Sequence, residues 1–296
     1  MPNKNNPNPP FPPLQTNGKN RFPFAVACPS FVHRAGYRDN VRALADFVDE
    51  IQLLFFESRA ESIPSHALIR ELGGMAAEKK IGYQVHLPSD VHPGHPDPGE
   101  RRRAADAWAT IIDRCTPLGP STFTLHLSRN PQDSPPISDA QWRANLQETI
   151  KAMLPTGLDH GRISAESLDY PLDWVAPVIT ATGLSVCMDM GHLLVHGENI
   201  VEFYRRWKTR VTTIHLHGVD GHRDHLPLNR LAAHQMAAVL QILNTFTGGV
   251  TLEVYSHAAL DASLGCLAAH WSGGKRRRTT RPKTRMRCEP SKTGKP

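Results

Sequence analysis

The sequence predicts a single closed (β/α)8 barrel, in which eight parallel strands are each followed by a helix. Three observations predict it: β-rich runs alternate with longer helical patterns, eight such pairs follow one another, and all of them fit within residues 23–271. Strand-to-helix alternation with right-handed crossovers gives a parallel sheet, and eight repeats in about 250 residues suit a closed barrel. An open doubly wound sheet is the structural alternative, but it rarely needs eight regular units of this length.

The expected strands are short runs rich in β-branched and aromatic residues. They occupy residues 22–28, 51–57, 81–87, 121–127, 161–168, 184–190, 211–217 and 249–255. The helical patterns between them repeat their apolar residues every three or four positions. They occupy residues 38–48, 65–79, 101–115, 138–154, 171–182, 198–207, 229–243 and 259–271. Pro171 opens one of these helices, in the first turn, where proline is tolerated.

The two ends of the chain differ from the barrel in composition and charge. Residues 1–22 are rich in Asn and Pro and are expected to form a disordered leader, and residues 272–296 a disordered basic tail. The formal charge of the chain is +6, of which 272–296 contribute +9 and 1–22 contribute +3, so residues 23–271 carry −6. An acidic barrel disfavours nucleic acid as a partner, and the tail is expected to be a solubilising extension rather than a polyanion-binding arm.

Membrane and disulfide classes are also disfavoured. No apolar run approaches the roughly 18 residues of a membrane span, and residues 1–22 lack the pattern of a secretory signal, so a cytoplasmic protein is expected. The cysteines form an odd count without a CxxC pair, which argues against a disulfide framework and a thiolate zinc site; they are Cys28, Cys115, Cys187, Cys266 and Cys288. Cys28 and Cys187 lie in apolar runs and are expected in the core. The oligomeric state is left open.

Polar residues mark the ends of seven of the expected strands, where a (β/α)8 barrel carries its functional side chains. From the second strand to the eighth they are Glu57, His86, His126, Glu166, Asp189 with His192, His215 with His217, and Glu253. Alone, such a histidine is more often a hydrogen-bonded core residue, and such a glutamate can cap the following helix. Together, several buried acids require a counter-charge. The sequence therefore predicts a divalent metal site, and mixed imidazole and carboxylate ligands suit Zn²⁺, Mn²⁺ or Fe²⁺.

The segment Thr213–Leu226, TIHLHGVDGHRDHL, extends this pattern beyond the seventh strand. His215 and His217 are two residues apart and share the face that points into the barrel mouth. Asp224 and His225 are expected to reach back over the metals. Asp220 and His222 are their alternates.

The order of these ligands resembles that of the xylose-isomerase-like TIM-barrel superfamily, over essentially residues 23–271. That group includes sugar isomerases and epimerases, inosose dehydratases and the endonuclease IV class of DNA-repair enzymes. Its minimal metal set is matched by Glu166, Asp189, His215 and Glu253. The endonuclease IV class holds three metals with further ligands, which the resemblance places on His86, His126 and His192. This chain has Asp224 and His225 adjacent where that class has an Asp-x-His pair, so the resemblance implies two metals and leaves a third open.

A narrower resemblance, to the cobamide-remodelling phosphodiesterases (the CbiR family), rests on long blocks in the same order. The blocks are FVHRAGYRDNVRALADFVDEIQLLFFES, YQVHLPSD, RISAESLDYPLDW, VCMDMGHLL, IHLHGVDGHRDHLPL and VTLEVYS. It implies a corrinoid substrate: hydrolysis of the nucleotide-loop phosphodiester of adenosylcobamides, and of GDP-activated adenosylcobinamide, to adenosylcobinamide phosphate. Ser167 departs from this family, where an Asn follows the Glu.

The mechanism expected from the resemblance is metal-assisted hydrolysis. One ion is expected on Glu166, Asp189, His215 and Glu253, and a second on His86, His126 and His192. Asp224 and His225 are expected to complete a site or to handle the leaving-group proton, and Glu57 to orient a ligand or act as general base. Three alternatives stay open: a sugar phosphate isomerase or epimerase, a DNA-repair endonuclease, and a non-catalytic corrinoid-binding barrel.

Overall fold

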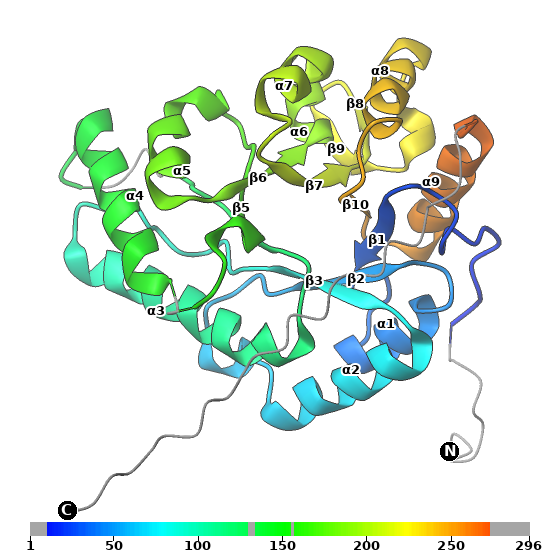
Figure 1. The fold of residues 1–296 in the computed structure, drawn as a ribbon, viewed down its shortest axis with the longest axis horizontal. Coiled ribbons are helices and arrows are strands. Elements are labelled where there is room, and N and C mark those ends of the chain that lie inside the picture. The colour runs from blue at the N-terminus through cyan, green and yellow to red at the C-terminus, as the bar shows by residue number, and fades with distance from the viewer. Residues whose placement is uncertain (1–10, 130–133, 155–156, 273–296) are drawn as a thin grey trace, which may run out of the picture.

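Eight parallel strands close into a barrel in the computed structural model, which describes residues 11–129, 134–154 and 157–272. Around the barrel the strands pair in the order β1-β10-β7-β6-β5-β4-β3-β2, and the helices surround them (Figure 1). The strands are β1 (Ala25–Pro29), β2 (Glu50–Leu54), β3 (Gly82–His86), β4 (Phe123–Leu125), β5 (Ile163–Glu166), β6 (Ser185–Asp189), β7 (Val211–Leu216) and β10 (Gly249–Leu252). The predicted (β/α)8 barrel is confirmed, and each of its strands overlaps an expected run.

Several helices begin at a side chain that caps them. Ser65, Asp97, Ser138, Asn199 and Ser256 each accept a hydrogen bond from a backbone N–H of the first turn. The helices are α1 (Tyr37–Leu44), α2 (His66–Lys79), α3 (Pro98–Cys115), α4 (Asp139–Met153), α5 (Ala176–Thr182), α6 (Met190–Val195), α7 (Ile200–Trp207), α8 (Ala233–Leu243) and α9 (His257–His270). Within the described ranges, no helix has the length and apolar character that crossing a membrane requires.

The inside of the barrel is polar and hydrogen-bonded below the site. Thr251 Oγ1 on β10 donates to Gln84 Oε1 on β3 at 2.7 Å, and Gln52 on β2 lies 2.7 Å from His215 on β7. These strands are not neighbours, so both contacts cross the barrel interior. All four side chains are wholly buried. The apolar core therefore lies mainly between the strands and the helices, and the interior supports polar chemistry at the carboxyl ends.

Residues 11–22 correct the expected boundary of the leader, because they pack against the barrel. Leu14 and Phe22 are buried, and the Phe22 ring lies 5.7 Å from that of Trp271. Lys19 Nζ donates to the carbonyls of Ala45 and Lys79, both at 2.7 Å. The segment is rich in Asn and Pro, but its two buried apolar side chains, Leu14 and Phe22, hold it against the barrel. The remainder of the expected leader and residues 273–296 lie outside the described residues.

Leu14→Ala is expected to lower the free energy of unfolding by about 2 kcal/mol or more, because it removes a buried side chain from the core. Chemical denaturation of the full chain measures this change. Pro13→Ala, at an exposed neighbouring position, is the matched control and is expected to leave the stability unchanged. An unchanged stability in Leu14→Ala would mean that the segment is not held on the barrel.

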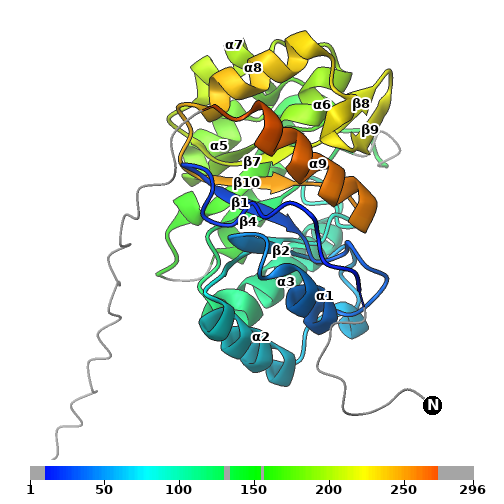
Figure 2. The ribbon, with the colours of Figure 1, turned by 90° about the vertical axis from the view of Figure 1, so that its right-hand side faces the viewer.

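Two elements were not expected from the sequence. The helix α6 follows β6 directly, because Asp189 ends the strand and its Oδ1 accepts from the backbone N–H of His192 at 2.8 Å. The polar segment after β7 is an antiparallel hairpin, β8 (Gly218–Asp220) and β9 (Arg223–Leu226). Figure 2 shows this hairpin beside α6, beyond the barrel strands. Both elements bring histidines to the mouth of the barrel.

Candidate metal centre

The predicted ligands meet at the carboxyl ends of the strands, in four groups whose ligand atoms lie within 4.8 Å of one another. The groups are His86, His126 and Glu166; Glu166, Asp189, His215 and Glu253; His192, His217 and His225; and Glu166, Cys187 and His215. Every residue predicted as a metal ligand is therefore in a group, except Asp224. The Asp224 carboxylate lies at the edge of the group formed by His192, His217 and His225, with its Oδ2 4.0 Å from His192 Nε2.

Glu166 connects the first two groups. Its Oε2 lies 3.3 Å from His86 Nε2, 3.2 Å from His126 Nε2 and 3.4 Å from His215 Nδ1. The side chain is buried at the end of β5, where the barrel directs it into the centre. A carboxylate in this position can bridge two cations, because each of its oxygens has more than one lone pair.

The second group has the composition of a four-ligand site on four successive strands. His215 Nδ1 lies 3.0 Å from Glu253 Oε2 and 3.8 Å from Asp189 Oδ2. His215 Nδ1 and Asp189 Oδ2 are buried and make no aligned hydrogen bond with any described residue. A buried polar atom without a partner costs about 1–3 kcal/mol. A divalent cation would satisfy both atoms, so this donor set fits a metal ion.

The third group changes the assignment of His192. The sequence placed His192 on the same ion as His86 and His126, but its ring lies 5.6 Å from those of both His217 and His225, between centroids. The reason is α6, which carries His192 one turn beyond Asp189 toward the hairpin. His192 therefore belongs to a three-histidine group that adjoins the four-ligand set, since its Nδ1 lies 3.5 Å from Asp189 Oδ2 and 3.6 Å from Glu166 Oε1.

His225 enters this group through a strained backbone. Its φ is +48°, a left-handed conformation that residues other than glycine rarely adopt. In this conformation its backbone N–H donates to His217 Nδ1 at 2.9 Å, and the two ring centroids lie 4.2 Å apart. Strain of this kind persists where the surroundings impose it, often at functional sites. The hairpin thus holds His225 over the centre.

Charge at the centre shifts the pKa values of its members in opposite directions. Burial raises the pKa of Glu253, but the facing His215 charge outweighs it and lowers the pKa to about 2. Burial lowers the pKa of His217, yet the Asp189 carboxylate, 3.1 Å from its Nε2, raises that pKa to about 9. In the metal-free protein, protonated imidazoles therefore balance the carboxylates. Metal ions would replace these protons, since a ligand histidine is deprotonated at its ligand nitrogen.

Cys187 lies close to the ligand atoms of Glu166 and His215, but its thiol is poorly suited to binding a metal. It is wholly buried on β6, and burial raises the pKa of its thiol to about 12. A thiolate is the form that binds metals, so this neutral thiol is a poor ligand. Its burial agrees with the expected core role.

Gln52 contacts the candidate centre and was not predicted from the sequence. It is wholly buried on β2, its amide lies 2.7 Å from His215 Nε2, and its Oε1 lacks a partner among the described residues. A half-turn of the amide places Oε1 against His215 Nε2–H, which satisfies that oxygen and leaves the Nδ1 lone pair facing the carboxylates. Gln52 then orients His215 for a metal, as the hydrogen-bonding partners of ligand histidines do. It lies within a strand rather than at its end, so the strand-end pattern gave no signal.

Gln52→Met is expected to weaken metal binding by about 10- to 100-fold, because His215 loses the partner that fixes its ring. Titration of the metal-free protein with Zn²⁺ or Mn²⁺ measures the dissociation constant. Gln84→Met is the matched control: it removes a buried amide that bonds Glu50 and Thr251 rather than a ligand. Equal metal affinities in wild type and Gln52→Met would contradict this role.

Three residues considered from the sequence lie outside the groups. Glu57, the expected orienter or general base, has a half-exposed carboxylate 3.6 Å from Arg59 Nε, because β2 ends three residues earlier. Asp220 pairs with Arg230 at 2.6 Å on the outer side of the hairpin. His222 is exposed at the hairpin turn. The structure does not bring these three side chains to the centre.

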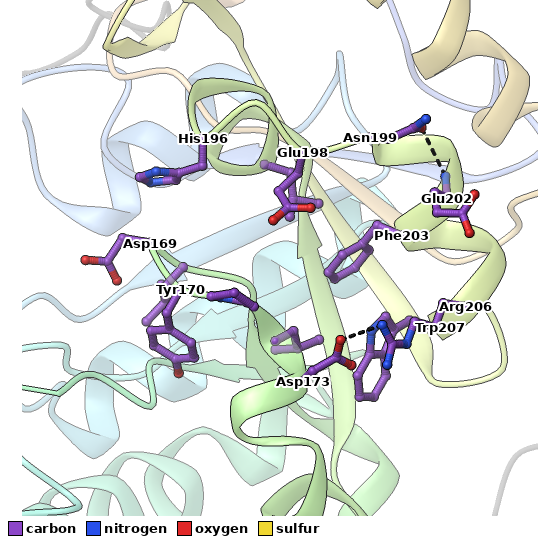
Figure 3. A pocket seen from close by; sticks show the side chains of 14 residues that line it. Asp169, Tyr170, Asp173, His196, Glu198, Asn199, Glu202, Phe203, Arg206 and Trp207 are labelled. Atoms are coloured by element: carbon purple, nitrogen blue, oxygen red, sulfur yellow. Dashed lines mark hydrogen bonds and ion pairs between the residues drawn. The ribbon is translucent and has the colours of Figure 1, made fainter. Parts of the chain in front are cut away.

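A cavity of about 350 Å³ lies between the segment after β5 and helices α6 and α7. Figure 3 shows its charged and aromatic lining, including the ion pair between Asp173 and Arg206. The described lining residues include one arginine, Arg206, and four acidic residues, Asp169, Asp173, Glu198 and Glu202. This wall disfavours an anionic phosphate, so the cavity is not where a phosphodiester is expected to bind.

The barrel fold agrees with comparison to known proteins. A family model described as a xylose isomerase-like TIM barrel matches residues 41–270. The chain belongs to this family. Comparison with curated protein sequences gives no match.

Solved structures with the same fold cover most of the chain at low sequence identity. A D-tagatose 3-epimerase-like protein is 16% identical, with 83% of this chain and 96% of that chain covered and a TM-score of 0.69. D-psicose 3-epimerase from Clostridium cellulolyticum H10 is 15% identical, with 83% and 98% covered and a TM-score of 0.66. The IolI protein, solved with a zinc atom, is 13% identical, with 84% and 100% covered and a TM-score of 0.66. At these identities the likeness shows the fold alone.

Proposed function

We propose that this protein is a metal-dependent phosphodiesterase that hydrolyses the nucleotide-loop phosphodiester of adenosylcobamides to adenosylcobinamide phosphate. The observation that carries the proposal is the pair of histidine groups beside the four-ligand set: His86 with His126, and His192 with His217 and His225. Proton transfer on a sugar needs one polarising cation. Displacement at phosphorus benefits from several, which neutralise the phosphate and the departing oxygen.

Divalent ions, when bound, supply an acidified water and positive charge for the phosphate oxygens. Glu166 would hold the first two groups at a fixed separation, because one carboxylate contacts both. Gln52 keeps the His215 ring in orientation. Asp224 is half exposed at the edge of the third group, where it can hold or release a proton at the leaving oxygen. These roles require the residues to be rigid, and the burial of Glu166 and His215 provides that rigidity.

The corrinoid part of the proposal is supported by the block-by-block resemblance to the cobamide-remodelling phosphodiesterases. The GDP-activated adenosylcobinamide is a second substrate implied by the same resemblance. The acidic barrel and the acidic wall of the α6–α7 cavity favour a small-molecule substrate over nucleic acid. The cytoplasmic location and the absence of a membrane partner stay predictions.

A sugar isomerase or epimerase is the second candidate, because the solved structures with this fold include the D-tagatose and D-psicose 3-epimerases. Such an enzyme would use Glu166, Asp189, His215 and Glu253. It would leave His86 and His126 without a catalytic task. The double variant His86→Ala/His126→Ala therefore separates the candidates: a phosphodiesterase loses activity, whereas an epimerase keeps it.

The proposal is tested by incubating the purified protein with adenosylcobalamin and Mn²⁺, Fe²⁺ or Zn²⁺, and identifying products by mass. We expect adenosylcobinamide phosphate and the released nucleoside. Intact adenosylcobalamin under all three metals, with epimerisation of a ketohexose, would replace the proposal by the second candidate. Cleavage of abasic DNA that disappears when residues 273–296 are deleted would instead favour a repair enzyme.

A further inference from the structure

Three of the most exposed large apolar side chains among the described residues meet at one part of the barrel mouth. Phe31 is 50% exposed, Phe56 45% and Tyr255 39%. The Phe31 and Phe56 ring centroids are 5.7 Å apart, and those of Phe56 and Tyr255 are 6.4 Å apart. Apolar side chains that gather on a surface, rather than lying singly, mark a binding site. We call these three residues the aromatic platform.

The platform is continuous with the metal centre. Its residues follow β1, β2 and β10, which are neighbours in the barrel (Figure 1). Glu253 directly follows β10, and the Tyr255 ring lies 5.1 Å from the ring of His225. The ends of β1 and β2 contribute nothing to the four ligand groups. The mouth is thus divided between a metal-binding part and an aromatic part, which meet where Tyr255 lies beside His225.

A cavity of about 390 Å³ opens against Phe31 and Phe56. Its polar lining residues include Glu57, Glu61 and Ser62. Carboxylates accept hydrogen bonds and repel anions. This combination of aromatic faces and acceptors suits a flat ring that carries N–H groups, and it disfavours a ring that carries acids.

We propose that the aromatic platform and this cavity form a subsite for an uncharged, unsaturated ring system bearing N–H donors, held beside the bond that is cleaved. The identity of the ring rests on the proposed function. A cobamide offers two such rings beside that bond: the corrin macrocycle with its uncharged carboxamide side chains, and the base of the nucleotide loop where that base is a purine with an amino group, such as adenine. A simple sugar offers none, so the subsite also selects against sugars.

The test compares two partial substrates by equilibrium dialysis against the metal-loaded full chain. Cobinamide has the macrocycle without the base, and the α-riboside of adenine has a base with N–H donors without the macrocycle. In Phe31→Ala/Phe56→Ala we expect the dissociation constant of one of them to rise about tenfold or more, with unchanged metal content and melting temperature. A rise for cobinamide assigns the subsite to the macrocycle, and a rise for the α-riboside of adenine assigns it to the base. Cobyrinic acid, a macrocycle with carboxylates, is expected to bind wild type more weakly than cobinamide.

Two control variants test whether the effect on binding is specific to the rings of Phe31 and Phe56. Phe31→Tyr/Phe56→Tyr retains both rings and is expected to bind as wild type does. Trp174→Ala removes the other strongly exposed aromatic side chain, after β5, and is expected to leave both dissociation constants unchanged.

Unchanged binding of both compounds in the double alanine variant overturns the subsite, even if wild type cleaves adenosylcobalamin. Cobyrinic acid binding as tightly as cobinamide overturns its preference for uncharged rings. Weakened binding in the double variant, with no cleavage by wild type, upholds the subsite and overturns the proposed hydrolysis. Wild type that binds neither compound overturns both.

Discussion

Glu166→Ala is expected to lower kcat/KM for phosphodiester cleavage by about a thousandfold or more, because one carboxylate serves two ligand groups. The same variant is expected to lose metal from both groups. Rates with adenosylcobalamin and metal content per chain, measured on the same preparation, check both effects. Glu166→Gln keeps the size of the side chain and removes the charge, so it is expected to show the same loss without a cavity.

Glu71→Gln is the control for Glu166. Glu71 lies on α2, exposed and paired with Arg38 on the outside of the barrel. Glu71→Gln makes the same chemical change at a residue that has no contact with the centre. The activity of this variant is therefore expected to stay within about twofold of wild type. Wild-type turnover in Glu166→Gln would remove the metal centre from the mechanism.

The metal-free protein is expected to lose stability between about pH 6.5 and pH 9. The folded-state pKa of His217 is raised to about 9 by Asp189, so its contribution is complete below the unfolded value and is lost as the pH rises through 9. The loss is on the order of 3 kcal/mol. The pKa of Glu253 is lowered to about 2, so its contribution is present above the unfolded value and is lost as the pH falls through 2.

Denaturation of metal-free and metal-loaded protein across this range is the measurement. Metal-loaded protein is expected to show the opposite slope, because metals bind deprotonated histidine and therefore bind more tightly at higher pH. Parallel pH profiles for the two forms would mean that metal ions do not replace protons at this centre.

The positions of the strands and most of the ligands could be predicted from the sequence for one physical reason. Parallel strands are buried on both faces, so each appears as a short apolar run, and the carboxyl ends of all eight meet at one mouth. Polar residues at the end of an apolar run, such as Glu166 or His215, are therefore brought together regardless of the conformation of the loops.

What could not be predicted depends on contacts between distant segments. Gln52 lies in the middle of its strand, where the sequence pattern does not mark it. Its contact with His215 forms only because β2 and β7 face each other across the barrel. The grouping of His192 with His217 and His225 depends on α6 and on the left-handed backbone of His225. Leu14 anchors a segment whose composition indicates disorder. In each case, the position of the residue is decided by a tertiary contact that the local sequence pattern does not indicate.

Hydrolysis of adenosylcobalamin in water enriched with oxygen-18 tests the central claim, which is attack of water at phosphorus within the metal centre. We expect one oxygen-18 atom in the phosphate of adenosylcobinamide phosphate, detected by mass, in wild type and in none of the Glu166 variants. Oxygen-18 in the released nucleoside instead of the phosphate would place the cleavage at carbon, and would contradict the account.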